Sequence, residues 1–348
     1  MERKITKQVK IGDVLIGGGA PISVQSMLNK PAEDIEGSVK QALELQKAGC
    51  NIIRAAVPNK EAVKLIEALK ENLSVPVVAD IHFDYRLALE CAAAGVDKIR
   101  INPGNIGSDD RVKAVADACR QKNIPIRIGV NSGSVEKEIL AKYGSPVPEA
   151  LVESALYHAS LLEKFDFDDI VISIKSSNVE NTVKAYSLAS EKCNYPLHVG
   201  VTEAGTSRMG IVKSSIGIGS LLLKGIGDTI RVSLTDSPVK EVAAGYDILK
   251  AVGLKKDAVQ IVSCPTCGRT KIDLISLANE VESALASCTK PIKVAVMGCV
   301  VNGPGEASDA DIGIAGGKDE ALLFIRGEKI RMLKGDIVGQ LLEEIHKM

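Results

Sequence analysis

The sequence predicts an α/β protein in which a (β/α)8 barrel is followed by a smaller α+β domain. Between residues 22 and 252, short β-branched runs alternate with longer stretches of helical apolar spacing. Eight such units without a dinucleotide-binding fingerprint favour a closed barrel over an open doubly wound sheet. Near residue 255 the composition changes and a cysteine motif follows. We therefore expect domains at residues 1–255 and 256–348.

Eight strand-like runs define the predicted barrel. They are ISVQSM (22–27), NIIRAAV (51–57), VPVVADI (75–81), KIRIN (98–102), PIRIGV (125–130), DIVISIK (169–175), LHVGVTE (197–203) and TIRVSL (229–234). Amphipathic stretches such as 33–49 and 84–95 lie between them and end at glycine, which is typical of a helix C-cap. Glycine clusters at 17–19 and 215–220 lack a phosphate-loop pattern, so we interpret them as turns and helix packing.

The second domain has a mixed pattern. The sequence predicts a helix at about 272–287, a strand at 291–298, a Gly/Asn/Asp-rich loop over 299–317, a strand-like stretch over 321–333 and a last helix at 335–347.

Composition narrows the class of protein. Lys+Arg (43) and Asp+Glu (44) leave a formal net charge of −1, which argues against a general nucleic-acid-binding surface or a polybasic membrane anchor. Aromatic residues make up 3% with no Trp, so base-stacking platforms are not expected. No export signal or long uncharged apolar segment is visible, and we expect a soluble cytoplasmic protein without a membrane partner.

Charged residues interrupt the predicted barrel strands near their C-terminal ends. Buried parallel strands are normally continuous runs of Val, Ile and Leu. Here five cations break them, and neighbours two residues away share their face. The cations are Arg54, Arg100, Arg127, Lys175 and Arg231, and the polar residues on the same faces include Asn102, Asn131 and Ser233. Asp80 and His82 share a face on the third strand, and Glu203 ends the seventh.

This excess of cations predicts an anionic ligand. Internal ion pairs could explain a single buried cation, but five cations face two carboxylates, Asp80 and Glu203. A buried charge without an ion-pair partner destabilises the folded state by on the order of several kcal/mol. Arginine suits phosphate oxygens, and barrel active sites lie at this end. A phosphorylated small molecule fits best and a polycarboxylate less well. Glu203 is a candidate general acid or base, or else a counter-ion of Arg231 or Lys175.

Three cysteines predict a metal or cluster site. Cys264 and Cys267 have C-x₂-C spacing, and Cys299 follows at the end of a predicted strand. No fourth Cys or His lies nearby, but Glu306 in NGPGE offers an oxygen ligand. Three thiolates and a carboxylate favour an iron–sulfur cluster over a closed zinc site, which stays the alternative. The remaining cysteines are interpreted as small packing residues.

The segments SCPTCGR and MGCVVNGPGEA, downstream of a barrel that carries VTEAG, give the chain a specific resemblance. It resembles the bacterial two-domain 4-hydroxy-3-methylbut-2-en-1-yl diphosphate synthases, iron–sulfur enzymes of the methylerythritol phosphate route to isoprenoids. The resemblance covers essentially the whole chain. The chain is too short for the middle domain of plant-type members.

The resemblance implies a TIM barrel followed by a small domain that holds a [4Fe-4S] cluster through Cys264, Cys267, Cys299 and Glu306. It implies reductive ring opening of 2-C-methyl-D-erythritol 2,4-cyclodiphosphate, with flavodoxin or ferredoxin as electron donor. The cations, together with His82 and Asp80, would bind the substrate, and Asn102, Asn131 and Ser233 would add hydrogen bonds. Glu203 would act on an intermediate, and Asn302 would lie beside the cluster. A homodimer is implied, in which one chain's cluster domain closes the partner's barrel. A zinc-dependent barrel enzyme, such as a relative of pterin-handling methyltransferases, and a non-catalytic metal-binding module remain alternatives.

Overall fold

The computed structural model describes residues 2–286, 288–300, 305, 307–317 and 320–348. The chain divides into two units, one ending at Val252 and the other running from Gly253 to Met348. Among the helices of the described residues, none is long and apolar enough to cross a membrane.

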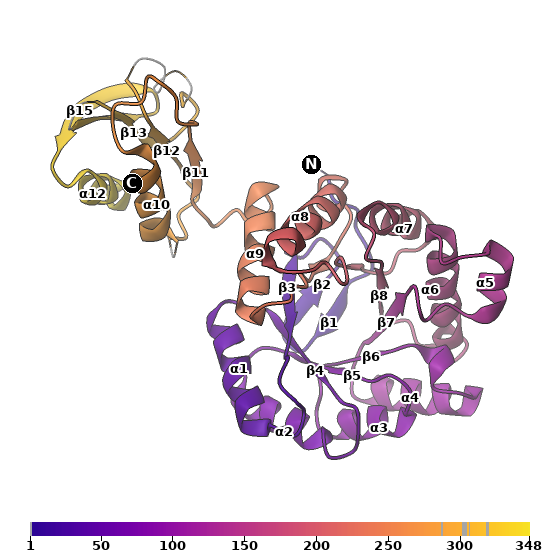
Figure 1. Cartoon of the computed structure of the whole chain (residues 1–348). Helices are drawn as coiled ribbons and strands as arrows, with labels where there is room; N and C mark the ends of the chain where they lie inside the picture. Colours follow the sequence, from indigo (N-terminus) through magenta and orange to yellow (C-terminus); the bar gives the residue numbers. More distant parts are fainter. Residues whose placement is uncertain (1, 287, 301–304, 306, 318–319) are drawn as a thin grey trace. The chain divides into compact units, whose positions relative to one another are not determined.

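Eight parallel strands form the barrel of the first unit (Figure 1). Their hydrogen-bonded order is β8-β7-β6-β5-β4-β3-β10-β9, and a parallel bridge between Ile172 and Leu197 joins β8 to the segment of β9. This closes the ring, so the predicted (β/α)8 barrel is confirmed. The strands are β3 (Ser23–Met27), β4 (Ile52–Ala56), β5 (Val77–Asp80), β6 (Lys98–Ile101), β7 (Ile126–Asn131), β8 (Ile170–Lys175), β9 (His198–Val199) and β10 (Thr229–Ile230).

Helices surround the strands, as Figure 1 shows. They are α1 (Ile35–Lys47), α2 (Val63–Asn72), α3 (Tyr85–Ala93), α4 (Asp109–Gln121), α5 (Lys137–Tyr143), α6 (Pro148–Glu163), α7 (Val179–Lys192), α8 (Ser207–Leu223) and α9 (Pro238–Ala251), with a 3-10 turn at Pro103–Asn105. In α1 the Asp34 carboxylate accepts a hydrogen bond from the Gly37 N–H, and the helix buries Ala42 and Leu45. This N-cap and apolar spacing explain why the segment is helical.

A hairpin closes the N-terminal end of the barrel. β1 (Val9–Ile11) pairs antiparallel with β2 (Val14–Ile16), an element that the sequence analysis did not predict. Val9, Ile11 and Ile16 form one buried cluster with barrel residues Ile52, Val78 and Val171. We call these six residues the apolar floor. Val78 on β5 and Val171 on β8 belong to strands separated by two others, so they meet only across the barrel interior.

The second unit is a five-stranded mixed sheet. The strands β11 (Gln260–Ser263), β12 (Lys293–Met297), β13 (Ile312–Gly316), β14 (Glu320–Ile325) and β15 (Glu328–Lys334) are hydrogen-bonded in sequence order. β11, β12 and β13 run parallel to one another, and β14 pairs antiparallel with both β13 and β15. α10 (Leu274–Leu285) and α12 (Ile337–Lys347) pack on this sheet in one apolar cluster.

Two strands of this unit differ from the sequence prediction. β11 was not predicted, and β13 lies inside the segment predicted to be a loop. The glycines that suggested a loop serve close packing instead, because a Cβ at Gly313 would lie 2.4 Å from Phe324 Cζ.

Candidate active site

The interior of the barrel above the apolar floor is charged. Arg54, Asp80 and Ser173 each lie two residues after a floor residue and therefore point to the same inward side. The strand register extends this face, because Lys98 pairs with Val78, and Arg100 pairs with both Asp80 and Arg127. We call the following residues the charged interior: Arg54, Asp80, Lys98, Arg100, Arg127, Lys175, His198 and Arg231.

Asp80 joins two of the predicted arginines. Its carboxylate is 2% exposed and lies 3.0 Å from Arg54 Nη2 and 3.2 Å from Arg100 Nη1. Burial alone would raise the pKa of Asp80, but Arg54 and then Arg100 outweigh it and hold the pKa well below its usual range. Asp80 is therefore ionised, and it fixes both guanidinium groups.

Arg100 is held from its other side by β7. Its Nη2 donates to the Gly129 carbonyl at 2.6 Å, and the Gly129 N–H donates to Asn102 Oδ1 at 2.9 Å. A Cβ at position 129 would lie 2.3 Å from Arg100 Nε. Glycine is needed here because the arginine side chain occupies that space.

Arg231 pairs with Glu241, a carboxylate that the sequence analysis missed. Glu241 is 3% exposed in the first turn of α9, with Oε1 lying 3.3 Å from Arg231 Nη2. It also accepts hydrogen bonds from Ser26 Oγ at 2.8 Å and the Leu234 N–H at 3.0 Å. The available signal was a glutamate on the otherwise apolar face of the predicted helix.

Glu203 lies elsewhere than expected. β9 ends at Val199, so the prediction that Glu203 ends this strand is wrong, and the residue lies in the following loop. Its side chain is exposed and its backbone adopts φ +50°, a left-handed conformation that is uncommon for a non-glycine residue. It makes no ion pair with the described residues, so Arg231 has Glu241 as its counter-ion instead. β10 is equally short, and Arg231 and Ser233 follow it instead of lying in a strand.

Three cations of the charged interior have no carboxylate partner among the described residues: Lys98, Arg127 and Lys175. Lys98 and Arg127 are 0% and 1% exposed, and Lys98 Nζ and Arg127 Nε and Nη1 make no hydrogen bond to the rest of the described chain. Burial, followed by repulsion from neighbouring arginines, lowers the pKa of Lys98 and of Lys175 well below the usual value. Six basic side chains therefore share two carboxylates among the described residues, Asp80 and Glu241.

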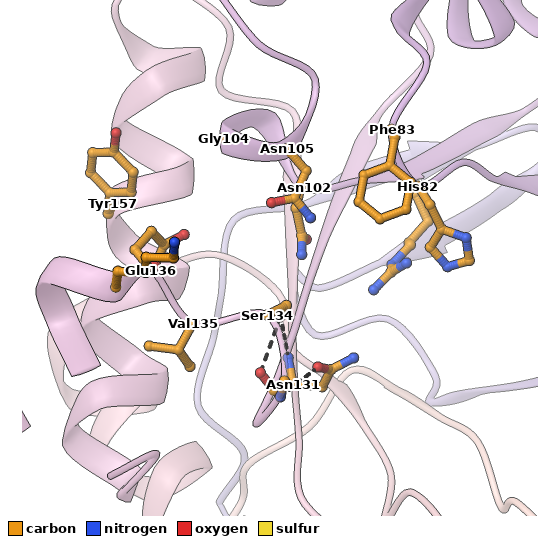
Figure 2. Close-up of a pocket in the computed structure, with 13 residues that line it drawn as sticks. His82, Phe83, Asn102, Gly104, Asn105, Asn131, Ser134, Val135, Glu136 and Tyr157 are labelled. Carbon is orange, nitrogen blue, oxygen red and sulfur yellow. Dashed lines mark hydrogen bonds between the residues drawn. The ribbon is translucent and has the colours of Figure 1, made fainter. Parts of the chain in front are cut away.

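A pocket of about 520 Å³ opens beside this interior, at the C-terminal ends of β5, β6 and β7. Figure 2 shows His82 and Phe83 on one side and Glu136 and Tyr157 on the other. The predicted residues Arg100, Asn102 and Asn131 also line it. Asn131 is held in place because its Oδ1 accepts from the Gly133 N–H and its N–H donates to Ser134 Oγ. His82 is exposed and lies in the loop after β5.

The structure brings two of the predicted cluster cysteines to one edge of the second sheet. Cys264 directly follows β11 and Cys299 lies two residues after β12, and these strands are parallel neighbours. The Gly298 N–H donates to Cys264 Sγ at 3.2 Å. Cys267 is exposed, and hydrogen bonds from the backbone and side chain of Arg269 lower the pKa of its thiol.

These cysteines fit a thiolate-bound group in donor type and in placement, because Cys264 and Cys299 follow neighbouring strands and the lowered pKa of Cys267 favours its thiolate. Among the residues that the structure describes, no three Cys, His, Asp or Glu side chains lie close enough together to hold a metal ion. Glu306 and Asn302 lie outside the described residues.

Two family models match the chain: the GcpE TIM-barrel domain over residues 6–246 and the GcpE protein C-terminal domain over residues 260–347. The chain belongs to the GcpE family. Two relatives, from Clostridium perfringens and Clostridium acetobutylicum, are named 4-hydroxy-3-methylbut-2-en-1-yl diphosphate synthase (flavodoxin). The first is 60% identical over 99% of both chains, and the second is 58% identical over 100% of both. The family expected from the two cysteine segments is thus confirmed.

Solved structures resemble the GcpE-family barrel at low identity. Dihydropteroate synthase from Yersinia pestis has a TM-score of 0.52 at 15% identity, over 71% of this chain and 98% of that one. 3-Dehydroquinate dehydratase from Geobacillus kaustophilus has a TM-score of 0.51 at 14% identity, over 70% of this chain and 97% of that one. These likenesses concern the barrel fold alone.

Proposed function

We propose that this GcpE-family chain reduces 2-C-methyl-D-erythritol 2,4-cyclodiphosphate to 4-hydroxy-3-methylbut-2-en-1-yl diphosphate. In this reaction two electrons and two protons enter, the ring opens, and one water leaves. Relatives that are 52–60% identical over nearly the whole chain are named as synthases of this diphosphate, which supports the choice of product. The observation that carries the proposal is the charged interior, where six cations share two carboxylates and so require an anionic ligand.

The residues of the barrel divide into two roles. Asp80 and Glu241 orient Arg54, Arg100 and Arg231, whose planar groups suit phosphate oxygens. The remaining substrate contacts are assigned to side chains at the strand ends and in the loops that follow: His82, Asn102, Arg127, Asn131, Lys175 and Ser233.

Glu203 is proposed as the group that delivers a proton to the departing hydroxyl oxygen. Its exposed side chain and its freedom from ion pairs among the described residues leave the carboxyl group available to exchange protons with solvent. Its left-handed backbone conformation is strained for a non-glycine residue, and such strain is common at functional sites, which supports this role for Glu203.

A [4Fe-4S] cluster is proposed as the cofactor, held by Cys264, Cys267, Cys299 and Glu306, with Asn302 beside it. When bound, the cluster supplies the electrons for the reduction. The parallel strands that bring Cys264 and Cys299 to one edge, and the lowered thiol pKa of Cys267, support this ligand set. Zinc on the same cysteines is the alternative.

The chain is further proposed to accept electrons from flavodoxin, the donor in its relatives' name, or from ferredoxin, and to form a homodimer. An apolar stripe on α8 supports self-association, since large apolar side chains on one helix face are about half exposed. They are Met209 (50%), Val212 (44%), Ile216 (54%) and Leu223 (58%). We expect Ile216→Lys to convert a dimer into a monomer in sedimentation experiments, while Lys184→Met on α7 should leave the dimer intact.

The test of the function uses the full chain purified without oxygen. We expect the broad visible absorption of a thiolate-bound iron cluster, and formation of the linear diphosphate from the cyclic one with a chemical reductant or reduced flavodoxin. Cys299→Ser should lose both, whereas Cys119→Ser, a buried barrel cysteine, should retain both. A colourless zinc protein, or a coloured one that leaves the cyclic diphosphate unchanged, would overturn the proposal.

A further inference from the structure

Lys98 is the most deeply buried cation of the barrel. It is the first residue of β6, is 0% exposed, and its Nζ has no hydrogen-bond partner within the described chain. In the sequence it is the first residue of the predicted strand KIRIN (98–102). The register pairs it with Val78, which also pairs with Arg54, so Arg54 and Lys98 flank the same floor residue on neighbouring strands.

Two further buried donors face the same interior. Arg127 on β7 leaves Nε and Nη1 without partners among the described residues, and His198 on β9 does the same with Nε2. Both side chains are at most 1% exposed. Strand register places all three inward: Arg127 pairs with Arg100, two residues after Lys98, and His198 pairs with Thr229, two residues before Arg231. We call Lys98, Arg127 and His198 the inner cluster.

The inner cluster brings together hydrogen-bond donors that have no carboxylate partner among the described residues. Burial, and then Arg127 and Arg54, lower the pKa of Lys98, and no carboxylate opposes this shift. Burial followed by Arg127 and the two lysines does the same to the pKa of His198. A buried polar group without a partner destabilises the folded state, and a charged one does so more strongly. A ligand that supplies acceptor oxygens at this depth would remove that cost.

We propose that the inner cluster is a phosphate-oxygen subsite, in which Lys98 Nζ binds an oxygen of the bound diphosphate. This inference rests on the proposed function and deepens it, because it adds Lys98 and His198 as ligands. Two phosphate groups would then be treated unequally. One would contact the arginines that Asp80 and Glu241 hold, and the other would reach the donors that have no partner among the described residues.

The experiment compares wild type with Lys98→Met, which keeps the length of the side chain and removes its charge. Binding of the cyclic diphosphate and of inorganic pyrophosphate is measured by calorimetry on the full, cluster-loaded chain, and thermal unfolding is measured without ligand. We expect the affinity for both to fall about 10- to 150-fold, the value of a charge-assisted hydrogen bond. The ligand-free unfolding temperature should stay equal or rise, because a buried amino group without a partner among the described residues has been removed.

Lys184→Met, the same substitution at an exposed ion pair on α7, is the matched control and should change neither property. If Lys98→Met does not fold, His198→Leu decides, with an expected loss of about 2- to 10-fold for a neutral donor. Unchanged affinity in a folded variant would overturn the subsite while wild-type binding still supported the proposed function. Wild type that bound neither ligand would overturn both.

A free anion bound independently of substrate is the competing explanation. Chloride at millimolar concentration would then raise the unfolding temperature of wild type but not of Lys98→Met, with equal pyrophosphate affinity in the two proteins. That combination would overturn the assignment to a phosphate oxygen. We expect instead that chloride has the same small effect on both.

Discussion

The two halves of the barrel interior are built from the same strands but follow opposite rules. At the N-terminal end, Ile52, Val78 and Val171 pack against the β1–β2 hairpin in a buried apolar cluster. Two residues further along the same strands, the side chains are Arg54, Asp80 and Ser173. The side chains of the apolar floor pack against one another, whereas several buried donors of the charged interior have no hydrogen-bond partner among the described residues.

This difference shows how the fold separates stability from ligand binding. A two-residue step along a strand keeps a side chain on the inward face but moves it closer to the mouth. The floor supplies buried apolar area that offsets the cost of holding cations together above it. We therefore expect substitutions in the floor to change the free energy of unfolding, and substitutions above it to change ligand affinity. Asp80 is the exception that should change both.

Asp80→Asn should have the largest effect. It leaves Arg54 and Arg100 without their shared carboxylate, which should cost about 3–5 kcal/mol of unfolding free energy. Because the pKa of Asp80 is lowered in the folded barrel, its contribution is fully present above about pH 4 and is lost as the pH falls further. Denaturant unfolding across this pH range measures both. The variant should lack this acid-dependent loss, and it should bind pyrophosphate more weakly than wild type, because Arg54 and Arg100 are no longer oriented.

Asp117→Asn on α4 is the matched control, because that carboxylate pairs with Lys113 and Arg120 at the surface. Its cost should stay below about 1 kcal/mol. Equal losses in the two variants would mean that the Asp80 cluster is no more important to the fold than a surface pair.

Arg127→Met should follow, with pyrophosphate affinity reduced by about 10- to 150-fold and cluster absorbance unchanged. Arg231→Met removes an arginine that already has a carboxylate partner, so its effect should lie at the lower end of that range. Equilibrium binding measures both, with Arg120→Met at the surface of α4 as control. Unchanged affinity in both variants would contradict a phosphate site in the charged interior.

Glu241→Gln should have a smaller effect that appears in KM. The amide oxygen can still accept from the Leu234 N–H, and the amide NH2 can donate to Ser26 Oγ, but the side chain no longer holds the Arg231 guanidinium by charge. We expect KM for the cyclic diphosphate to rise about 3- to 10-fold, on the order of one hydrogen bond, with little change in kcat. Ser26→Ala, which removes one contact of Glu241 but keeps its charge, should raise KM less than twofold, on the order of a few tenths of a kcal/mol. A fall in kcat at constant KM would assign Glu241 a different role.

The sequence was sufficient to predict the barrel and most of its charges, because both depend on local patterns. Strand and helix periodicity is visible within about ten residues, and an arginine inside a β-branched run is conspicuous. The boundaries of β9 and β10 were less accurate, since only two residues of each pair with neighbouring strands and the rest is loop.

The partners of these charges could not be predicted, because they depend on tertiary packing. Glu203 and Glu241 are both carboxylates near predicted strand or helix ends, and only the position of α9 selects Glu241 as the counter-ion of Arg231. Lys98 at a strand start is typical of a solvated edge, and its burial follows from closure of the barrel around it. The cluster ligands were predicted from spacing, and the set of four stays a prediction.

Ile52→Val should have the smallest effect and gives the sharpest test of the comparison. The substitution removes one methyl group from the apolar floor, two residues before Arg54 on the same strand. We expect the unfolding free energy to fall by about 0.5–1.5 kcal/mol, measured by denaturant unfolding, with pyrophosphate affinity unchanged. Leu43→Val on the exposed side of α1 is the control and should cost less, because its side chain is 42% exposed. If affinity fell together with stability, packing in the floor would set the position of Arg54, and the two halves of the interior would be coupled instead of separate.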